Sequence, residues 1–263
     1  DGFSIGTSSM INGNSDTFVS WNWKANGADS TNTDGSKTST VSVNSTAGFS
    51  IVKFSGDPSS SATIGHGLGV TPSMIITKSR GSTDNWVIYH KSLGASAYIE
   101  LDNAGAKGTS GSVYRWNDTA PTNSVFSVGA GSGTNNSSQI AYCFAEKNGY
   151  SKFGSYSGND NADGPFIYTG FKPAFVIIKE ALASRDWIML DNKRDTDNVV
   201  SNRLFPNSSD AQNTNNDMLD FLSNGFKIRN TNSTANNNGD NNYIFMAFAE
   251  EPLVANVGAS IPA

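Results

Sequence analysis

Three aspartates lie close together in the second half of the chain, at Asp191, Asp195 and Asp197. Glycoside hydrolysis requires two facing carboxyl groups, one as general acid and the other as nucleophile or base. The corresponding stretch of an internal repeat, residues 90–94, contains no acid. We therefore interpret these aspartates as part of a solvated, charge-balanced loop, and a glycan depolymerase is the least favoured function.

Nucleophilic catalysis has few candidates in this sequence. A Ser or Cys nucleophile needs a histidine base and an acid within reach, and the 263 residues include two His and one Cys. His66 and His90 lie outside any nucleophile-elbow pattern, and Cys143 alternates with Tyr142 and Phe144 as a small buried residue would. Two His and one Cys are also too few metal ligands for a typical structural zinc site. The sequence predicts a protein that is not an enzyme and has no cofactor, calcium excepted.

A calcium site is suggested by Asn159, Asn161 and Asp163. Their side-chain oxygens alternate along the chain and Gly164 follows, as at the start of a calcium-binding loop. The bidentate acid that should close such a loop is missing. Two interpretations stay open, a bound calcium ion and a plain series of Asx turns.

Tryptophans are candidates for stacking against sugar rings. Trp86 and Trp187 recur in register with apolar strand patterns, so both are expected in the core. Trp116 lies between Arg115 and Asn117 in a region without a counterpart elsewhere in the chain. We expect Trp116 to be an exposed ligand-contact residue on a loop.

An internal repeat organises these candidates. Three landmark residues recur at one constant offset of 101 positions, which places Pro72, Lys78 and Trp86 opposite Pro173, Lys179 and Trp187. The far ends of the two units also match, since 126–128 followed by 139–146 resembles 226–228 followed by 243–250. The start of the chain, with 3–6 and 17–24, repeats that far end alone.

The repeat predicts five segments. We expect the C-terminal part of a truncated first unit at 1–27, a linker at 28–46, full units at 47–148 and 149–253, and a tail at 254–263. The linker is assigned because it is rich in Ser, Thr, Asn, Asp and Gly and has no aromatic residue, so it should build no core.

Each full unit is predicted to consist of strands. Residues 74–77 and 175–178 are short, continuous apolar runs, which are typical of strands buried on both faces. Residues 126–128 and 226–228 alternate apolar and polar side chains, and no segment shows a helical stripe with caps. The expected fold is all-β, with tandem β-sandwich units of a jelly-roll-like kind.

Composition excludes two classes of partner. Only 16% of residues are charged, the formal net charge is −5, and 18 Lys and Arg are outnumbered by 23 Asp and Glu. A nucleic-acid surface is therefore not expected. No apolar run approaches the roughly 18 residues of a membrane span, so none is predicted.

Five segments of the chain resemble a known family. They are 64–72, which includes Gly65-His66-Gly67-Leu68-Gly69, together with 144–154, 191–194, 204–209 and 251–254. They are similar to the repeated β domain near the C-terminus of tail-fibre and other virion proteins of marine tailed phages, cyanophages among them. That family offers no well-established catalytic residues, so none are transferred.

The resemblance implies a virion-surface protein of the tail. Such a protein would form a homo-oligomer, with a trimer favoured, bind other virion proteins, and contact a glycan or protein receptor on the host cell. A secreted lectin-like adhesin or a self-assembling surface fibril protein stays open as the alternative.

Overall fold

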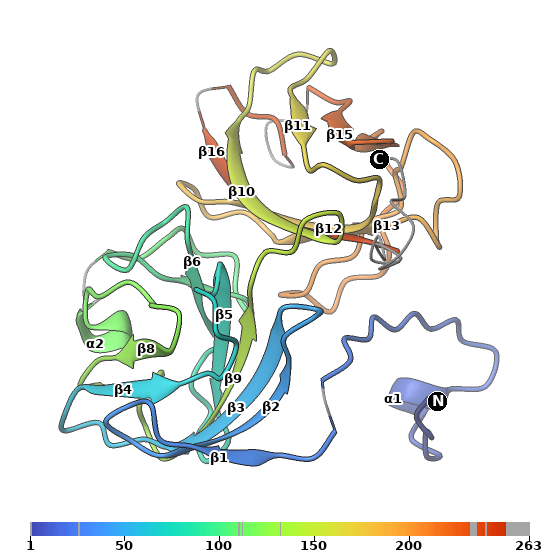
Figure 1. Ribbon diagram of the computed structural model, residues 1–263. Coiled ribbons are helices and arrows are strands. Elements are labelled where there is room, and N and C mark those ends of the chain that lie inside the picture. The colour runs from blue at the N-terminus through green and yellow to red at the C-terminus, as the bar shows by residue number, and fades with distance from the viewer. Residues whose placement is uncertain are drawn as a thin grey trace, which may run out of the picture.

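The computed structural model describes residues 2–25, 27–109, 111, 113–131, 133–231, 236–239 and 241–250 (Figure 1). Within these residues the chain is almost wholly β, as the sequence predicts, and its sheets are antiparallel. The described residues include two helices of four residues each, α1 (Ser9–Asn12) and α2 (Val113–Trp116). Among the residues that the structure describes, neither helix is long enough to cross a membrane.

The first half of the chain forms a two-layer sandwich. Its larger sheet has the order β1-β2-β3-β9-β5-β6-β7, and a second sheet pairs β4 with β8. The bounds are β1 Ser30–Asn32, β2 Ser39–Asn44, β3 Phe49–Ser55, β4 Ala62–Gly65, β5 Met74–Ser79, β6 Val87–His90, β7 Ile99–Glu100, β8 Val125–Val128 and β9 Ser138–Phe144. The apolar core between the layers includes Val52, Ile64, Ile75 and Phe126.

The second half forms a corresponding sandwich. One sheet has the order β10-β16-β12-β13 and the other the order β11-β15-β14. The bounds are β10 Ser151–Ser157, β11 Phe166–Tyr168, β12 Pro173–Glu180, β13 Ile188–Asp191, β14 Leu219–Leu222, β15 Gly225–Ile228 and β16 Asn242–Ala249. The order β10-β16-β12-β13 matches β3-β9-β5-β6 of the first half, in keeping with the sequence offset.

The two larger sheets also pack against each other. Along β12, Val176 and Ile178 belong to the core of the second half, whereas Phe175 and Ile177 belong to a third cluster shared with the first half. On the first half, that third cluster takes side chains such as Met74 and Phe144. Strand residues alternate between the two faces, so central strands such as β12 and β16 are buried on both faces. This arrangement explains the continuous apolar runs in the sequence.

The expectation of a linker at 28–46 is wrong. This segment contains β1 and β2, and β2 pairs with β3 along its whole length. Val41 is 4% exposed and lies in the core, with Val43 packed beside it. The alternation of valines with Ser and Thr is a strand pattern, and burial of one face outweighs the polar composition of the segment.

The N-terminal segment differs from the units that it resembles in sequence. Residues 17–25 form no strand, although their counterpart β9 lies between β3 and β5. Instead, Trp21 and Trp23 pack on the third cluster, where Trp23 makes edge-to-face contacts with Phe175 and Phe248. The segment therefore seals one end of the boundary between the two halves.

Candidate ligand-binding pocket

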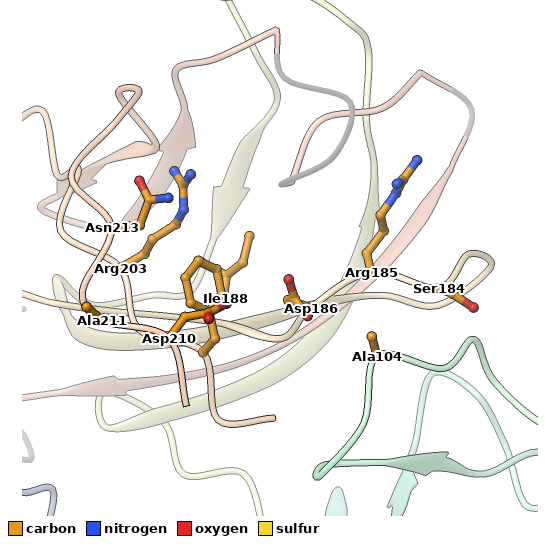
Figure 2. Close-up of a pocket in the computed structure, with 10 residues that line it drawn as sticks. Ala104, Ser184, Arg185, Asp186, Ile188, Arg203, Asp210, Ala211 and Asn213 are labelled. Carbon is orange, nitrogen blue, oxygen red and sulfur yellow. The ribbon is translucent and has the colours of Figure 1, made fainter. Parts of the chain in front are cut away.

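An open pocket of about 430 Å³ lies on the second half, between the start of β13 and the 203–213 loop (Figure 2). It reaches Ala104 of the first half. Its polar lining consists of Ser184, Arg185, Asp186, Arg203, Asp210 and Asn213. The apolar lining includes Ile188 and Phe205, both of which also pack on the core of the second half.

The 203–213 loop is held in place by backbone pairing. Arg203 and Asn213 exchange two backbone hydrogen bonds of 3.0 Å, and Met189 and Leu204 exchange another pair of 2.9 and 3.1 Å. The side-chain oxygen of Asn207 accepts a hydrogen bond from the backbone N–H of Trp187 at 2.8 Å, and its side-chain nitrogen donates to the Asp186 carboxylate at 2.8 Å. The loop is thereby fixed to β13, which gives the pocket a preformed shape.

Arg203 and Arg185 lie on opposite sides of Ile188 and Asp186 (Figure 2). Arg203 is 7% exposed; its Nη1 donates to the Asn215 carbonyl at 2.8 Å, and its guanidinium carbon lies 5.9 Å from the centre of the Phe205 ring. Burial lowers the pKa of Arg203, although an arginine stays protonated at neutral pH.

Arg185 is held differently. Its Nε lies 3.8 Å from Oε2 of Glu180, whose side chain is fully buried. That carboxylate oxygen has no hydrogen-bond partner within the described part of the chain. The Arg185 side chain is 40% exposed, so this residue balances a buried charge and also lines the pocket.

The pocket offers the chemistry of a polyol site. Guanidinium groups donate hydrogen bonds, carboxylates accept them, and Asn213 can do both. Ile188 and Phe205 supply an apolar surface beside these groups. Ligand sites of this kind fix orientation with a few polar groups above an apolar floor, and a sugar presents both kinds of surface.

The three aspartates that were candidates for a catalytic pair of carboxyl groups form structural hydrogen bonds instead. Asp191 accepts from the backbone N–H groups of Lys193 and Arg194 at 3.0 Å each and forms an ion pair with Arg194 at 2.7 Å. Asp195 accepts from the backbone N–H groups of 201 and 202. Asp197 accepts from Thr196. Asp195 and Asp197 agree with the loop interpretation, whereas the expectation of a solvated loop is wrong for Asp191, which ends β13 and is 2% exposed.

The expectation that Trp116 is exposed is wrong. Trp116 is 1% exposed, ends α2, and lies edge-to-face with Tyr89 at 5.9 Å between ring centres. It belongs to the core of the first half. A single helical turn folds the ring inward over β8, so Trp116 cannot contact a ligand at the surface.

The residues of the suggested calcium loop form consecutive Asx turns. Asn159 Oδ1 accepts from the Asn161 N–H at 3.1 Å, and Asn161 Oδ1 accepts from the Asp163 N–H at 2.9 Å. Asp163 forms an ion pair with Lys227 at 2.7 Å. No group of three His, Cys, Asp or Glu side chains converges as metal ligands within the described residues.

The histidines and the cysteine lie outside the pocket. In His66, Nδ1 accepts from the Leu68 N–H at 3.2 Å and Nε2 lies 3.2 Å from the Thr122 carbonyl, so the neutral ring satisfies both contacts. His90 is bonded in the same manner, to Ser92 and Phe245. Burial raises the pKa of Cys143 to about 12, which makes its thiol unreactive.

The sequence did not identify Arg185, Arg203 or Asp210 as site residues. All three lie in the second half, and the 203–213 loop has a counterpart in the first half, where Tyr98 and Gly108 exchange two backbone hydrogen bonds of 2.9 and 2.8 Å. The one available signal was the segment 204–209, which belongs to the phage-like resemblance and forms part of this loop.

Comparison with known proteins identifies the family. A family model described as a domain of unknown function, DUF7483, matches residues 1–252, and the chain therefore belongs to that family. No curated protein and no solved structure matches the chain significantly.

Proposed function

We propose that the chain is a non-enzymatic receptor-binding module of a phage tail fibre, which attaches to glycans on the host cell surface. The observation that carries this proposal is the preformed pocket between β13 and the 203–213 loop. Its guanidinium, carboxylate and amide groups stand beside Phe205 and Ile188, as a sugar ligand requires. The assignment to a virion rests on the five sequence segments that resemble tail-fibre proteins.

The architecture supports an extracellular structural role. Two sandwiches share an apolar cluster on which Trp21 and Trp23 pack, and this packing should limit movement between the halves. A rigid scaffold that presents binding groups on loops is a common arrangement in recognition proteins. We further propose that the module works as a homo-oligomer, with a trimer favoured, because multivalent contact strengthens attachment to a cell surface.

Binding of the fluorescently labelled protein to intact host cells tests the proposal. Cells are first treated with periodate, which destroys sugar rings, or with a protease, which removes surface proteins. The proposal expects periodate to abolish binding and protease to leave it unchanged. The opposite pattern would identify a protein receptor and overturn the glycan assignment, and binding to neither treated nor untreated cells would overturn the attachment function.

Light scattering on the same preparation tests the oligomer. A discrete trimer is the expected result. An open-ended filament would instead support the self-assembling surface fibril, and a monomer that binds cells would support a free lectin-like module.

A further inference from the structure

Two large aromatic side chains stand exposed on the short strand β11. Phe166 is 45% exposed and Tyr168 is 64% exposed, whereas Ile167 between them is 6% exposed and lies in the core. Because strand residues alternate, both rings lie on the outer face of the β11-β15-β14 sheet. Figure 1 places β11 at the end of the second half that is far from the first half.

A glycine makes room for the Phe166 ring against the backbone. A β-carbon on Gly225, which pairs with Tyr168, would lie 2.9 Å from Cζ of Phe166. The Phe166 ring therefore occupies space that a side chain at position 225 would otherwise fill. Phe166 and Tyr168 nevertheless keep 45% and 64% of their surface open to solvent.

The first half shows that the fold does not require this pair. There the corresponding strand is β4, whose outward residue is Thr63. Residues 36 and 37 cover it, since Ser36 N–H donates to Oγ1 of Thr63 at 2.8 Å and Lys37 N–H donates to its carbonyl at 3.2 Å. Within the described residues, β11 pairs with β15 alone. The second half thus has the exposed aromatic residues Phe166 and Tyr168 on the strand where the first half has the covered polar residue Thr63.

We propose that Phe166 and Tyr168 form an aromatic platform that binds pyranose rings of a polysaccharide. The C–H face of a sugar packs on an aromatic face, and rings at positions i and i+2 of a strand stand about 7 Å apart, so that two neighbouring sugars can be held. Lys227, paired in register with Phe166, and its partner Asp163 supply hydrogen-bonding groups for sugar hydroxyls beside the rings.

A polysaccharide fits this surface better than a protein partner. The apolar area consists of two side chains bordered by the Lys227–Asp163 ion pair, whereas a stable protein interface buries about 1,200–2,000 Å². The platform shares its ligand class with the proposed function but none of the pocket residues. The two sites can therefore succeed or fail independently.

Native affinity electrophoresis provides the test. The full chain is run through gels that contain laminarin, mannan, alginate or dextran, and retardation gives an association constant for each. The protein is compared with the double variant Phe166→Ala/Tyr168→Ala, with the pocket variant Arg185→Ala, and with Tyr114→Ala. Tyr114 is a matched control because it is 55% exposed and lies on the first half.

The proposal expects retardation by at least one polysaccharide and a loss of about tenfold or more in the double variant. Tyr114→Ala should be retarded as the unaltered protein is, and Tyr168→Trp should keep the interaction because the aromatic face remains. Retardation that is lost in Arg185→Ala and kept in the Phe166→Ala/Tyr168→Ala variant would place polysaccharide binding in the pocket and overturn the platform. Thermal unfolding of the double variant should be unchanged, since both side chains are exposed. Equal retardation of the double variant, or no retardation of the unaltered protein, would overturn the proposal.

Discussion

The Nε2 atom of His90 on β6 lies 3.2 Å from the carbonyl oxygen of Phe245 on β16, and this contact joins the two halves of the chain. The Nδ1 of the same ring accepts from the Ser92 N–H at 3.2 Å. The ring must therefore carry its proton on Nε2 and be neutral. Burial lowers the pKa of His90 to about 4, and the chain contains no carboxylate contact with this ring within the described residues.

Acid should weaken the boundary between the halves for this reason. The pKa of His90 is about 4 in the folded chain against 6.5 for an ordinary histidine, so protonation favours the unfolded state. The neutral His90 ring contributes fully to the free energy of unfolding above pH 6.5. This contribution is lost as the pH falls toward 4, and the loss is about 3 kcal/mol at most. The pKa of His66 is lowered in the same direction.

Urea unfolding of the protein and of His90→Gln between pH 7 and pH 5 measures this dependence. Glutamine can still donate to the Phe245 carbonyl but does not titrate. The variant should lose less stability than the unaltered protein over this interval. Parallel curves for the two proteins would show that His90 is not the titrating group.

Removal of the Trp23 side chain should destabilise the chain. Its ring lies 5.4 to 6.0 Å from the ring centres of Phe248, Phe175 and Phe144, at the boundary of the halves. Trp23→Ala should lower the free energy of unfolding by about 2–3 kcal/mol, less than for a fully buried tryptophan. Phe18→Ala is the matched control in the same segment, because Phe18 is 53% exposed, and it should change little. Equal effects would contradict the packing described for Trp23.

A second bond across the boundary can be tested by a smaller change. The indole Nε1 of Trp187 donates to the Glu100 carbonyl at 2.8 Å, and Trp187 is 1% exposed. Trp187→Phe leaves that carbonyl unpaired and should cost about 1–3 kcal/mol in chemical denaturation. Trp86→Phe alters a half-buried ring stacked on Tyr142 and should cost less. A larger loss for Trp86→Phe would argue against the importance of the Trp187 bond.

Calcium should not alter stability. The oxygens of Asn159 and Asn161 already accept backbone hydrogen bonds, and Asp163 is paired with Lys227. Melting temperatures measured with excess calcium and with a chelator should therefore coincide. A rise in melting temperature with calcium that disappears in Asp163→Asn would establish the metal site that the Asx turns argue against.

The repeated landmarks could be read from the sequence because each has a local structural cause. Lys78 donates to the Asp84 carbonyl, and Lys179 donates to the carbonyls of Glu180 and Ala183. Both lysines thus stabilise the turn after their strand. The buried strands β5 and β12 were also predictable, because their apolar runs reflect burial on two faces.

Other features depend on contacts between distant residues. Trp116 is buried because α2 folds over β8, and polar neighbours in the sequence gave no sign of this. The pocket exists because backbone bonds between Arg203 and Asn213 bring residues ten positions apart together beside β13. Val41 and Val43 alternate with polar residues as in a strand, but the polar composition around them led to the linker interpretation.

Binding of the protein to a glycan array tests the central claim most directly. The unaltered protein, Arg185→Ala/Asp210→Ala and the control Arg80→Ala are applied at equal concentration, where Arg80 is an exposed cation of the first half. A pocket that binds sugars predicts at least one family of glycans, apart from those held by Phe166 and Tyr168, that is bound by the unaltered protein and by Arg80→Ala and is lost in the double variant. The same glycans bound equally by all three proteins would contradict the assignment of the pocket.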